Sequence, residues 1–261
     1  MAKSKYEYVK SFEQDDRLLP ECWIVVRIDG RGFHKFADAH KYAKPNDMRG
    51  LQLMNRCAAN VMEQHSDIVV AFGESDEFSF VLRRSTALFQ RRASKIVSVI
   101  CSLFASSFVF HWKDHFDEKT DPLQYPPSFD GRAVCYPSTA SIRDYLSWRQ
   151  VDTHINNQYN TCFWLLVQQG GLSAAAAQLQ LKGTTTNDKN ELMFDRYGIN
   201  YSKLPAMFRK GSVLVREREE VLVKTSDEGF TVNRMRSRVA ILHEDIIQDH
   251  FWEQRPQLLA S

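Results

Sequence analysis

The chain has 261 residues, enough for one large domain or for a compact core with a second region attached. Hydrophobic residues make up 43% and charged residues 25% of the sequence, which excludes a disordered chain, and a net charge of +2 means that a polyanionic partner would bind through local basic patches. No apolar run approaches the roughly 20 residues that span a bilayer, and the first residues lack the hydrophobic core of a signal peptide, so a cytoplasmic or nuclear protein is expected.

The spacing of cysteines and histidines argues against several enzyme classes. The five cysteines are dispersed without a C-x-x-C pair, which predicts free thiols in a reducing compartment. His111 and His115 are four residues apart but have no nearby third ligand, so a zinc site lacks support. A P-loop and a G-x-S-x-G elbow are also missing from the sequence. Hydrolase and zinc-enzyme functions are therefore not favoured.

The first elements are predicted by apolar patterns in the N-terminal third of the chain. Residues 23–28 form a β-branched apolar run, which predicts a buried strand ending at Asp29-Gly30. Asp47 is placed to cap a helix that continues to about Gln64, because apolar residues recur there at helical spacing. A strand and a helix are thus expected before residue 65.

Two further strands, 67–72 and 78–82, are separated by five residues, a length that predicts a β-hairpin. A long helix over 86–112 and a strand over 133–136 follow. The resulting order β-α-β-β-α-β is that of the ferredoxin-like fold, an α+β arrangement with an antiparallel sheet under two helices. The palm of many polymerases and nucleotide cyclases shares this arrangement, which by itself assigns no function.

The second half is predicted to be mostly helical, with short strands near its end. Helical patterns cover 141–148, 150–169, 173–182 and 188–197. The short strands are 213–215 and 221–223, with a charged connection between them. This change in character predicts two parts: a palm-like catalytic core of residues 1–138, and a helical and mixed region of residues 139–261 packed on it.

Three carboxylates are expected to meet at one edge of the sheet. Asp29 ends the first strand, and Asp76 and Glu77 lie in the hairpin between the second and third strands. In a βαββαβ sheet the first strand lies beside the third, so the hairpin faces the end of the first strand. Like charges so close together favour a divalent cation, and a pair of Mg²⁺ ions supports in-line displacement at phosphorus. The alternative is that these are ordinary turn acids.

Glycines and basic residues near these acids suggest a site for phosphates. Gly30-Arg31-Gly32-Phe33 follows the strand directly, and two glycines let backbone N–H groups approach a triphosphate, although a simple turn would look the same. Arg91, Arg92 and Lys95 share one face of a predicted helix, and Lys44 precedes a helix start. A solvated basic face is the alternative for the helical group.

A polar run over 154–161 interrupts a helical stretch of the second half. It contains three asparagines, which are mediocre helix formers. The run is either a helix end with capping amides or a set of hydrogen-bonding groups for a base or ribose.

Several segments, taken together and in this order, resemble the tRNA-histidine guanylyltransferase family over essentially the whole chain. The hairpin alone is less specific, since it is also similar to the G-G-[DE]-E-F turn of nucleotide cyclases. The matching stretches are 27–31, 36–47 with its Ala-Lys-Pro-Asn-Asp, 73–77, Arg91-Arg92 with Lys95, 144–149, 154–161, 198–201 and 209–211. Ser202-Lys203 departs from the family pattern, and residues 216–240 match less well.

The resemblance implies a reaction in three stages. The 5′-monophosphate of tRNA-His is first activated with ATP, giving an adenylylated end. The 3′-hydroxyl of GTP then attacks the activated phosphate and expels AMP, and pyrophosphate is finally removed from the added nucleotide. Both nucleotidyl transfers are in-line displacements, so one pair of magnesium ions would serve them. The resemblance also implies a homotetramer in which residues 139–261 serve tRNA recognition and oligomerisation.

The resemblance also implies roles for matching residues. Asp29 and Asp76 are expected to bind the metal ions together with the Gly30 carbonyl, with Glu77 as a further catalytic group. The GTP triphosphate is expected at Gly30, Arg31, Gly32, Phe33, His34 and Ser75, and phosphates of nucleotide or tRNA at Lys44, Arg92 and Lys95. Asp29 and Asp76 are counted with the nucleotide-binding residues as well. Positions for activation or tRNA reading are Arg27, His154, Asn157, Lys189, Asn200 and Lys210.

Two other functions compete with this one. A nucleotide cyclase on the same palm would need only a nucleoside triphosphate and metal, and it has no use for the polar run over 154–161. A non-catalytic tRNA-binding protein would be indifferent to magnesium and to the three acids. Strictness for tRNA-His and dependence on a template are not determined by the sequence.

Overall fold

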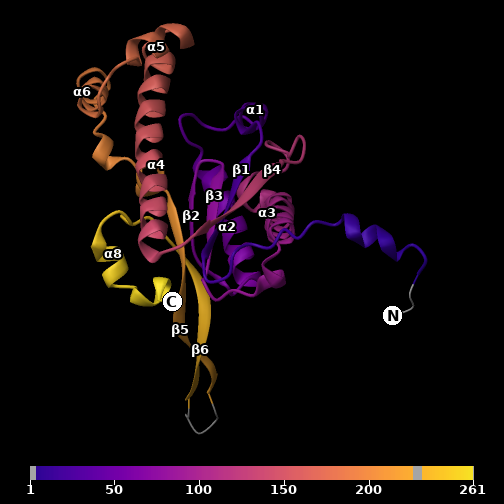
Figure 1. The fold of residues 1–261 in the computed structure, drawn as a ribbon. Coiled ribbons are helices and arrows are strands. Elements are labelled where there is room, and N and C mark those ends of the chain that lie inside the picture. The colour runs from indigo at the N-terminus through magenta and orange to yellow at the C-terminus, as the bar shows by residue number, and fades with distance from the viewer. Residues whose placement is uncertain (1–3, 226–230, 261) are drawn as a thin grey trace.

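The computed structural model describes residues 4–225 and 231–260 and contains one six-stranded antiparallel sheet with strand order β4-β1-β3-β2-β5-β6 (Figure 1). The first four positions are those of a ferredoxin-like sheet, so the predicted α+β palm is confirmed. The strands are β1 (Trp23–Gly30), β2 (Ile68–Glu74), β3 (Glu77–Leu82), β4 (Phe129–Tyr136), β5 (Ser212–Thr225) and β6 (Thr231–Leu242).

Helices cover both faces of this sheet. Alternate residues of β1 point to opposite faces, so Ile24 and Val26 join the core under α2 and α3, whereas Trp23 and Val25 join a second core under α4. The helices are α1 (Phe33–Ala39), α2 (Met48–Gln64), α3 (Ala93–His115), α4 (Thr139–Gln168), α5 (Ala174–Leu181), α6 (Thr186–Tyr197), α7 (Ala206–Lys210) and α8 (Asp249–Glu253), with 3-10 turns at Glu7–Phe12, Leu88–Arg91, Tyr201–Lys203 and Pro256–Leu259.

The predicted capping of α2 is confirmed, because the Asp47 side chain accepts a hydrogen bond from the Arg49 amide. The long third helix was predicted to begin at Thr86 but begins at Ala93. Phe89, Gln90 and Arg91 have positive φ angles of 49°, 55° and 62°, which no α-helix accommodates. Local side-chain periodicity does not reveal such a backbone reversal.

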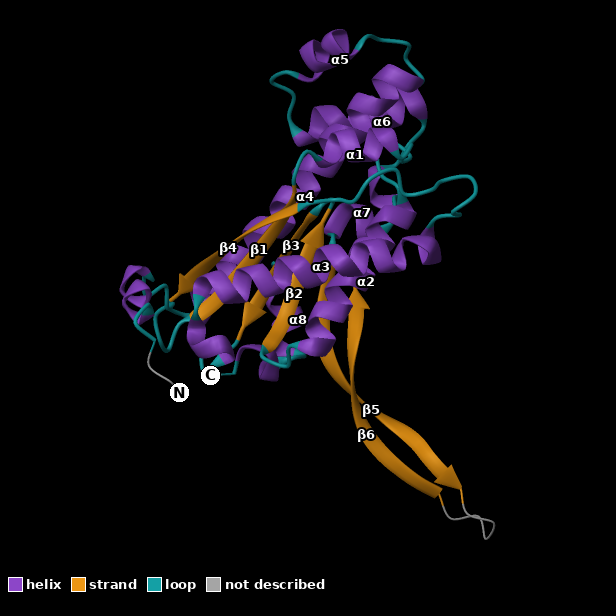
Figure 2. Cartoon of the chain, turned by 90° about the vertical axis from the view of Figure 1, so that its right-hand side faces the viewer, coloured by secondary structure: helices purple, strands orange, loops and turns teal. Residues whose placement is uncertain are grey.

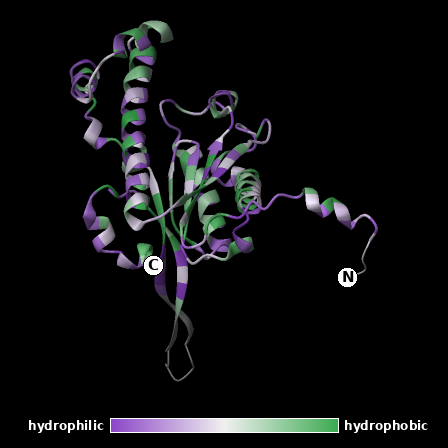
Figure 3. Cartoon of the chain, viewed as in Figure 1, coloured by the Kyte–Doolittle hydropathy of each residue, from purple (hydrophilic) through white to green (hydrophobic). Residues whose placement is uncertain are grey.

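Helix α4 is a single helix of 30 residues, so the expected interruption near residue 149 is wrong. It begins with a capping box at Ser138 and Ser141 and extends beyond the sheet, where α5 and α6 pack on its far end (Figure 2). Hydrophobic and hydrophilic residues alternate in bands along its whole length (Figure 3), as expected for a helix with one packed and one solvated face.

The two short strands predicted at 213–215 and 221–223 are parts of one continuous strand, β5, and the charged connection between them lies within it. The start of β5 pairs with Val70 to Gly73 of β2 on one side and with β6 on the other. Beyond that start β5 pairs with β6 alone, in a ribbon that projects from the body (Figure 2). A two-stranded ribbon has no neighbouring layer over much of its length, so an apolar alternation is not required there.

One helix within the described ranges, α3, is long and apolar enough to cross a membrane by length and composition, contrary to the expectation that no such run exists. Its Ile96, Ile100, Phe104 and Phe108 are fully buried in the core shared with β1 and α2, as in the core helix of a globular protein. The five cysteines are all free thiols, as predicted.

Candidate active site at the acidic hairpin

The β2–β3 hairpin lies directly beside the end of β1. The register pairs Asp29 with Glu77 across the two strands, and the Gly30 amide donates a 3.0 Å hydrogen bond to the Asp76 carbonyl. Ser75 makes the tight turn with a positive φ of 48°, and its hydroxyl donates to the Asp76 carboxylate at 3.0 Å. The first strand thus lies beside the third, as the sequence predicted.

Asp76 is in an environment that opposes its ionisation. Burial, with added repulsion from Asp29 and Glu77, raises the pKa of its carboxyl to about 6. A divalent cation bound here would relieve both effects. No group of three or more His, Cys, Asp or Glu side chains able to hold a metal is found in the parts of the chain that the structure describes. Asp29, Asp76 and Glu77 therefore do not form such a group, and metal binding by Asp29, Asp76 and the Gly30 carbonyl stays a prediction.

Glu77 is held from the opposite helix. Its carboxylate accepts a 2.9 Å hydrogen bond from Arg149 of α4, and both side chains are largely buried, at 14% and 5% exposure. Arg149 also donates to Asp152 at 3.0 Å. Sequence patterns give no sign of this contact, since the two residues are 72 positions apart. Glu77 therefore lies beside Asp29 with its charge paired to a buried guanidinium.

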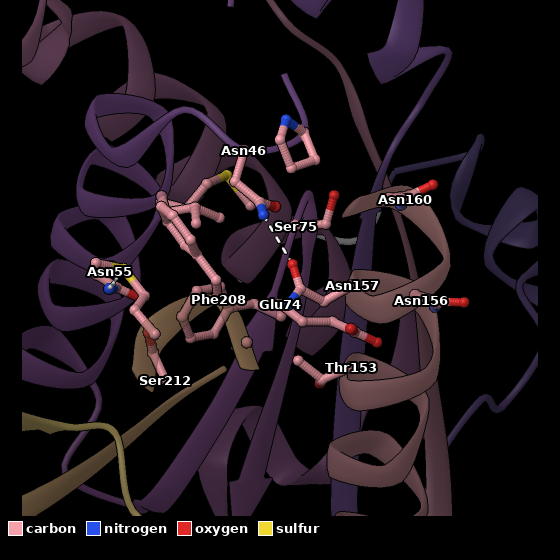
Figure 4. Close-up of a pocket in the computed structure, with 16 residues that line it drawn as sticks. Asn46, Asn55, Glu74, Ser75, Thr153, Asn156, Asn157, Asn160, Phe208 and Ser212 are labelled. Atoms are coloured by element: carbon pink, nitrogen blue, oxygen red, sulfur yellow. Dashed lines mark hydrogen bonds between the residues drawn. The ribbon is translucent and has the colours of Figure 1, made fainter. Parts of the chain in front are cut away.

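Glu74 is a second buried carboxyl that sequence reasoning missed. It ends β2 and points toward Thr153 of α4 in a small cavity of about 80 Å³ (Figure 4). Burial raises the pKa of Glu74 to about 8. On the other side of this cavity Asn46 donates a 2.8 Å hydrogen bond to the Asn157 side chain, which ties the loop before α2 to α4.

A larger cleft of about 710 Å³ opens next to Asp76, between the loop after β1, the start of α2 and the C-terminal third of α4. Gly32, with a φ of 62°, begins α1 there. Of the residues predicted to bind nucleotide, those that line this cleft are Gly30, Gly32, Phe33, His34, Lys44, Ser75 and Asp76. Arg31 instead lines a cavity of about 270 Å³ beside Ser128.

The structure does not bring Arg92 and Lys95 to this cleft. Their neighbour Arg91 donates a hydrogen bond to the carbonyl of Cys22, which directly precedes β1. Asp29 lies near the other end of β1, so Cys22 and Asp29 are about 25 Å apart in an extended strand. Arg92 is 3.6 Å from Asp16, and Lys95 lies over the ring of Phe89. Arg91 itself is buried, with a guanidinium that bonds backbone carbonyls, so its role is structural.

The residues predicted for activation or tRNA reading, except Arg27 of β1, lie on α4 and on the segments α6 to α7. His154 and Asn157 both contact the hydroxyl of Tyr201, at 3.3 Å and 3.1 Å, so the polar run lies inside α4 rather than at a helix end. Burial lowers the pKa of His154. Arg27 is half-buried on the β1 face that bears Asp29.

The other residues of this predicted group make local contacts. Asn200 accepts from the Ser202 amide and caps a 3-10 turn. The ammonium of Lys189 donates to the Thr184 carbonyl at 2.8 Å, and Lys210 ends α7, where its carbonyl accepts from Gln150. Asn200 and Lys189 therefore lie near the distal end of α4, whereas Lys210 lies close to the end of β2, because Ser212 pairs with Gly73.

Comparison with known proteins places the chain in a family. The family model described as tRNAHis guanylyltransferase matches residues 6–137, and the model described as Thg1 C terminal domain matches residues 140–248. A protein named "Probable tRNA(His) guanylyltransferase" from Dictyostelium discoideum is 56% identical, with all of both chains covered. One with the same name from Mus musculus is 54% identical, covering 100% of this chain and 90% of the relative.

Comparison with solved structures leads to the same family. The tRNA(His) guanylyltransferase of Saccharomyces cerevisiae superposes with a TM-score of 0.78 at 49% identity, covering 81% of this chain and 93% of that chain. A bacterial tRNA(His) guanylyltransferase-like protein in complex with ATP shares the fold at 22% identity, with a TM-score of 0.75 and 99% of this chain covered. The palm-like sheet, the acidic hairpin beside β1 and these matches lead to one conclusion: the chain belongs to the tRNA(His) guanylyltransferase family.

Proposed function

We propose that this protein adds a guanosine to the 5′ end of tRNA-His, using ATP for activation, GTP as donor and two Mg²⁺ ions. The observation that carries the proposal is that the hairpin puts Glu77 opposite Asp29 and bonds Asp76 to Gly30, with Asp76 at a cleft whose wall includes the loop after β1. In the activation step the 5′-phosphate attacks the α-phosphorus of ATP and pyrophosphate leaves. In the transfer step the GTP 3′-hydroxyl attacks the adenylylated phosphate and AMP leaves.

The chain's own groups would bind and orient these substrates. Asp29, Asp76 and the Gly30 carbonyl would hold the metal ions, which stabilise charge on phosphoryl oxygens when bound. Backbone N–H groups of Gly32, Phe33 and His34 would donate to a triphosphate, since those of Gly30 and Arg31 already bond the Asp76 and Ser128 carbonyls. The Ser75 hydroxyl lies at the same cleft. Lys44 would add a positive charge from the opposite wall. Glu77, paired with Arg149, would keep the hairpin in register with β1.

The proposal also covers tRNA recognition, the oligomeric state of the protein and its location in the cell. Residues 139–261 would recognise tRNA through the groups around His154 and Asn157, and the protein would act as a homotetramer in the cytoplasm or nucleus. Arg92 and Lys95, near the start of β1 and so at the opposite end of that strand from Asp29, would contact tRNA phosphates away from the cleft of the same subunit. Light scattering with and without tRNA tests the assembly, since a monomer under both conditions contradicts it.

The decisive experiment incubates 5′-phosphorylated tRNA-His with ATP, labelled GTP and Mg²⁺, with a tRNA of different anticodon in parallel. Incorporation of label at the 5′ end is expected, and Asp29→Ala and Asp76→Ala are expected to abolish it while the protein stays folded. Asp130→Ala is the matched control, because Asp130 pairs across the sheet with Asp29 but is exposed. Normal incorporation by the Asp76→Ala protein would contradict the metal assignment, and a cyclic product from GTP alone would indicate a cyclase.

A further inference from the structure

Helix α4 presents three aromatic side chains to the large cleft, opposite the loop after β1. They are Tyr159, Phe163 and Trp164, which we call the α4 aromatic wall. Tyr159 and Phe163 are one helical turn apart and nearly parallel, with ring centroids 6.4 Å apart and an interplanar angle of 11°. Trp164 meets Phe163 edge to face at 5.3 Å. All three side chains are half-buried, so each keeps part of its surface open.

Packing explains two of these rings but not the third. Tyr159 and Phe163 lie against the apolar cluster that joins α4 to α5 and α6. Trp164 belongs to none of the three apolar clusters of the described residues. Its ring faces the Lys44 ammonium, 5.4 Å from the ring centroid, and Lys44 is itself paired with the exposed Asp38 at 2.7 Å. A large ring is thus held in a polar cleft beside a cation.

Such a surface has the chemistry of a nucleobase site. Bases stack on aromatic rings whatever their sequence, and each such contact is worth about 1–3 kcal/mol. A lysine beside the ring is placed for the phosphate that accompanies a base. The asparagine amide of Asn160, which also lines the cleft, offers both a donor and an acceptor for a base edge. The cleft volume of about 710 Å³ lies in the range of small-ligand sites.

We infer that the α4 aromatic wall stacks a nucleobase, with Trp164 as its main contact, while the phosphates of the same or a second nucleotide lie at the loop after β1. This inference rests on the proposed function and specifies one of its substrate contacts. The base could come from a free nucleoside triphosphate or from the 5′-terminal nucleotide of the RNA, since both carry a base next to a phosphate.

Equilibrium binding separates these sources without requiring turnover. Dissociation constants are measured for GTP with Mg²⁺, ATP with Mg²⁺ and 5′-phosphorylated tRNA-His, using the wild-type protein, Trp164→Ala and Trp164→Phe. The Ala variant is expected to weaken binding of one of the three by about 5- to 150-fold, the range that corresponds to one stacking contact. The Phe variant is expected to stay within about threefold of the wild type, because it keeps an aromatic face.

The control is Phe110→Ala, which removes an exposed aromatic side chain from α3, outside the cleft. It is expected to leave all three constants unchanged, and melting curves of every variant check that the fold is kept. Weaker binding of a free nucleotide assigns the wall to that nucleotide, and weaker binding of RNA assigns it to the RNA end. Unchanged constants for Trp164→Ala, or equal losses for the Ala and Phe variants, would overturn the inference. Guanosine transfer is assayed separately, so altered binding without transfer would refute only the proposed function.

Discussion

At the tip of the β2–β3 hairpin, Asp76 has neighbours that oppose its negative charge. The raised pKa of about 6 means that the folded protein binds a proton there more tightly than an unfolded chain does. Folding therefore loses stability from this group as the pH rises from about 4 through 6, unless a cation compensates. The proposed metal site and the unfavourable ionisation of Asp76 in the metal-free protein would then have the same cause, the crowding of acids at the hairpin.

We expect Asp76→Asn to stabilise the metal-free protein at pH 7.5 by on the order of 1–2 kcal/mol, because the neutral amide removes the cost of ionising a buried carboxyl. The gain is smaller than the pKa shift alone would give, because solvent partly screens the charge. The gain is expected to shrink toward pH 4.5, where the native carboxyl is protonated. Urea unfolding with a chelator at both pH values measures this. Asp130→Asn serves as the exposed control. An Asp76→Asn protein that is less stable than the wild type at pH 7.5 would contradict the prediction.

Gly73 is fixed by a close ring contact rather than by its backbone angles. A Cβ atom at this position would lie 2.3 Å from the ring of Phe78, which is buried under the hairpin. We expect Gly73→Ala to cost about 1–3 kcal/mol, because a packed core accommodates an added methyl only by shifting side chains. Thermal unfolding measures the loss. The double variant Gly73→Ala with Phe78→Leu is expected to recover part of it, and an additive result would show that the ring is not the obstacle.

At the scale of elements, a buried ion pair joins α4 to β3, next to the 2.6 Å hydrogen bond between the Ser79 and Tyr145 hydroxyls. Arg149 and Glu77 are both largely withdrawn from water, so removal of either leaves an uncompensated charge. We expect Arg149→Met to destabilise the protein by about 3–5 kcal/mol and the combination with Glu77→Gln to cost clearly less than the sum of the single changes. Urea unfolding of the four proteins gives the coupling energy. Additive losses would mean that the pair contributes nothing beyond its separate side chains.

The elements of the palm were predictable where burial leaves a local pattern. The continuous apolar run of 23–28 is typical of a strand buried on both faces, and the capped helix after Asp47 has the spacing of one buried helical face. The spacing of the hairpin strands then predicted the neighbours of β1. Arg149 and Glu74 were missed because their partners lie on another element. The ribbon at 216–219 was missed because strands exposed on both sides lack an apolar alternation.

For the molecule as a whole, the two halves of the sequence form a single sheet. Trp23, Phe72 and Val81 of the first half are covered by α4, and β2 pairs with β5. We expect a fragment of residues 1–138 to aggregate, because it exposes this apolar face and the open edge of β2. Size-exclusion chromatography and thermal melting test this against the full chain. A monomeric fragment with a cooperative transition would show that the palm is autonomous.

Ligand binding to the cleft should raise the stability of the whole chain. We expect Mg²⁺ with GTP at 100 times its dissociation constant to add about 2.7 kcal/mol, since a ligand that binds only the native state shifts the unfolding equilibrium by mass action. Asp29→Ala is expected to remove most of the Mg²⁺-dependent part. Unfolding curves with GTP alone, with Mg²⁺ alone and with both separate the contributions. Equal stabilisation of the variant and the wild type by both together would argue against Asp29 as a metal ligand.

Because α4 is one uninterrupted helix, it can transmit movement along its length as a rigid rod. Arg149 anchors the helix to β3, and the remaining residues to Gln168 form a rod of about 28 Å that carries α5 and α6. A rod pivoting at that anchor by about 5° would move its tip by about 2.5 Å while barely shifting the hairpin, given a rise of about 1.5 Å per residue. If RNA binds the distal helices, as proposed, its contacts there would reach the carboxylates as a displacement much smaller than that of the helix tip.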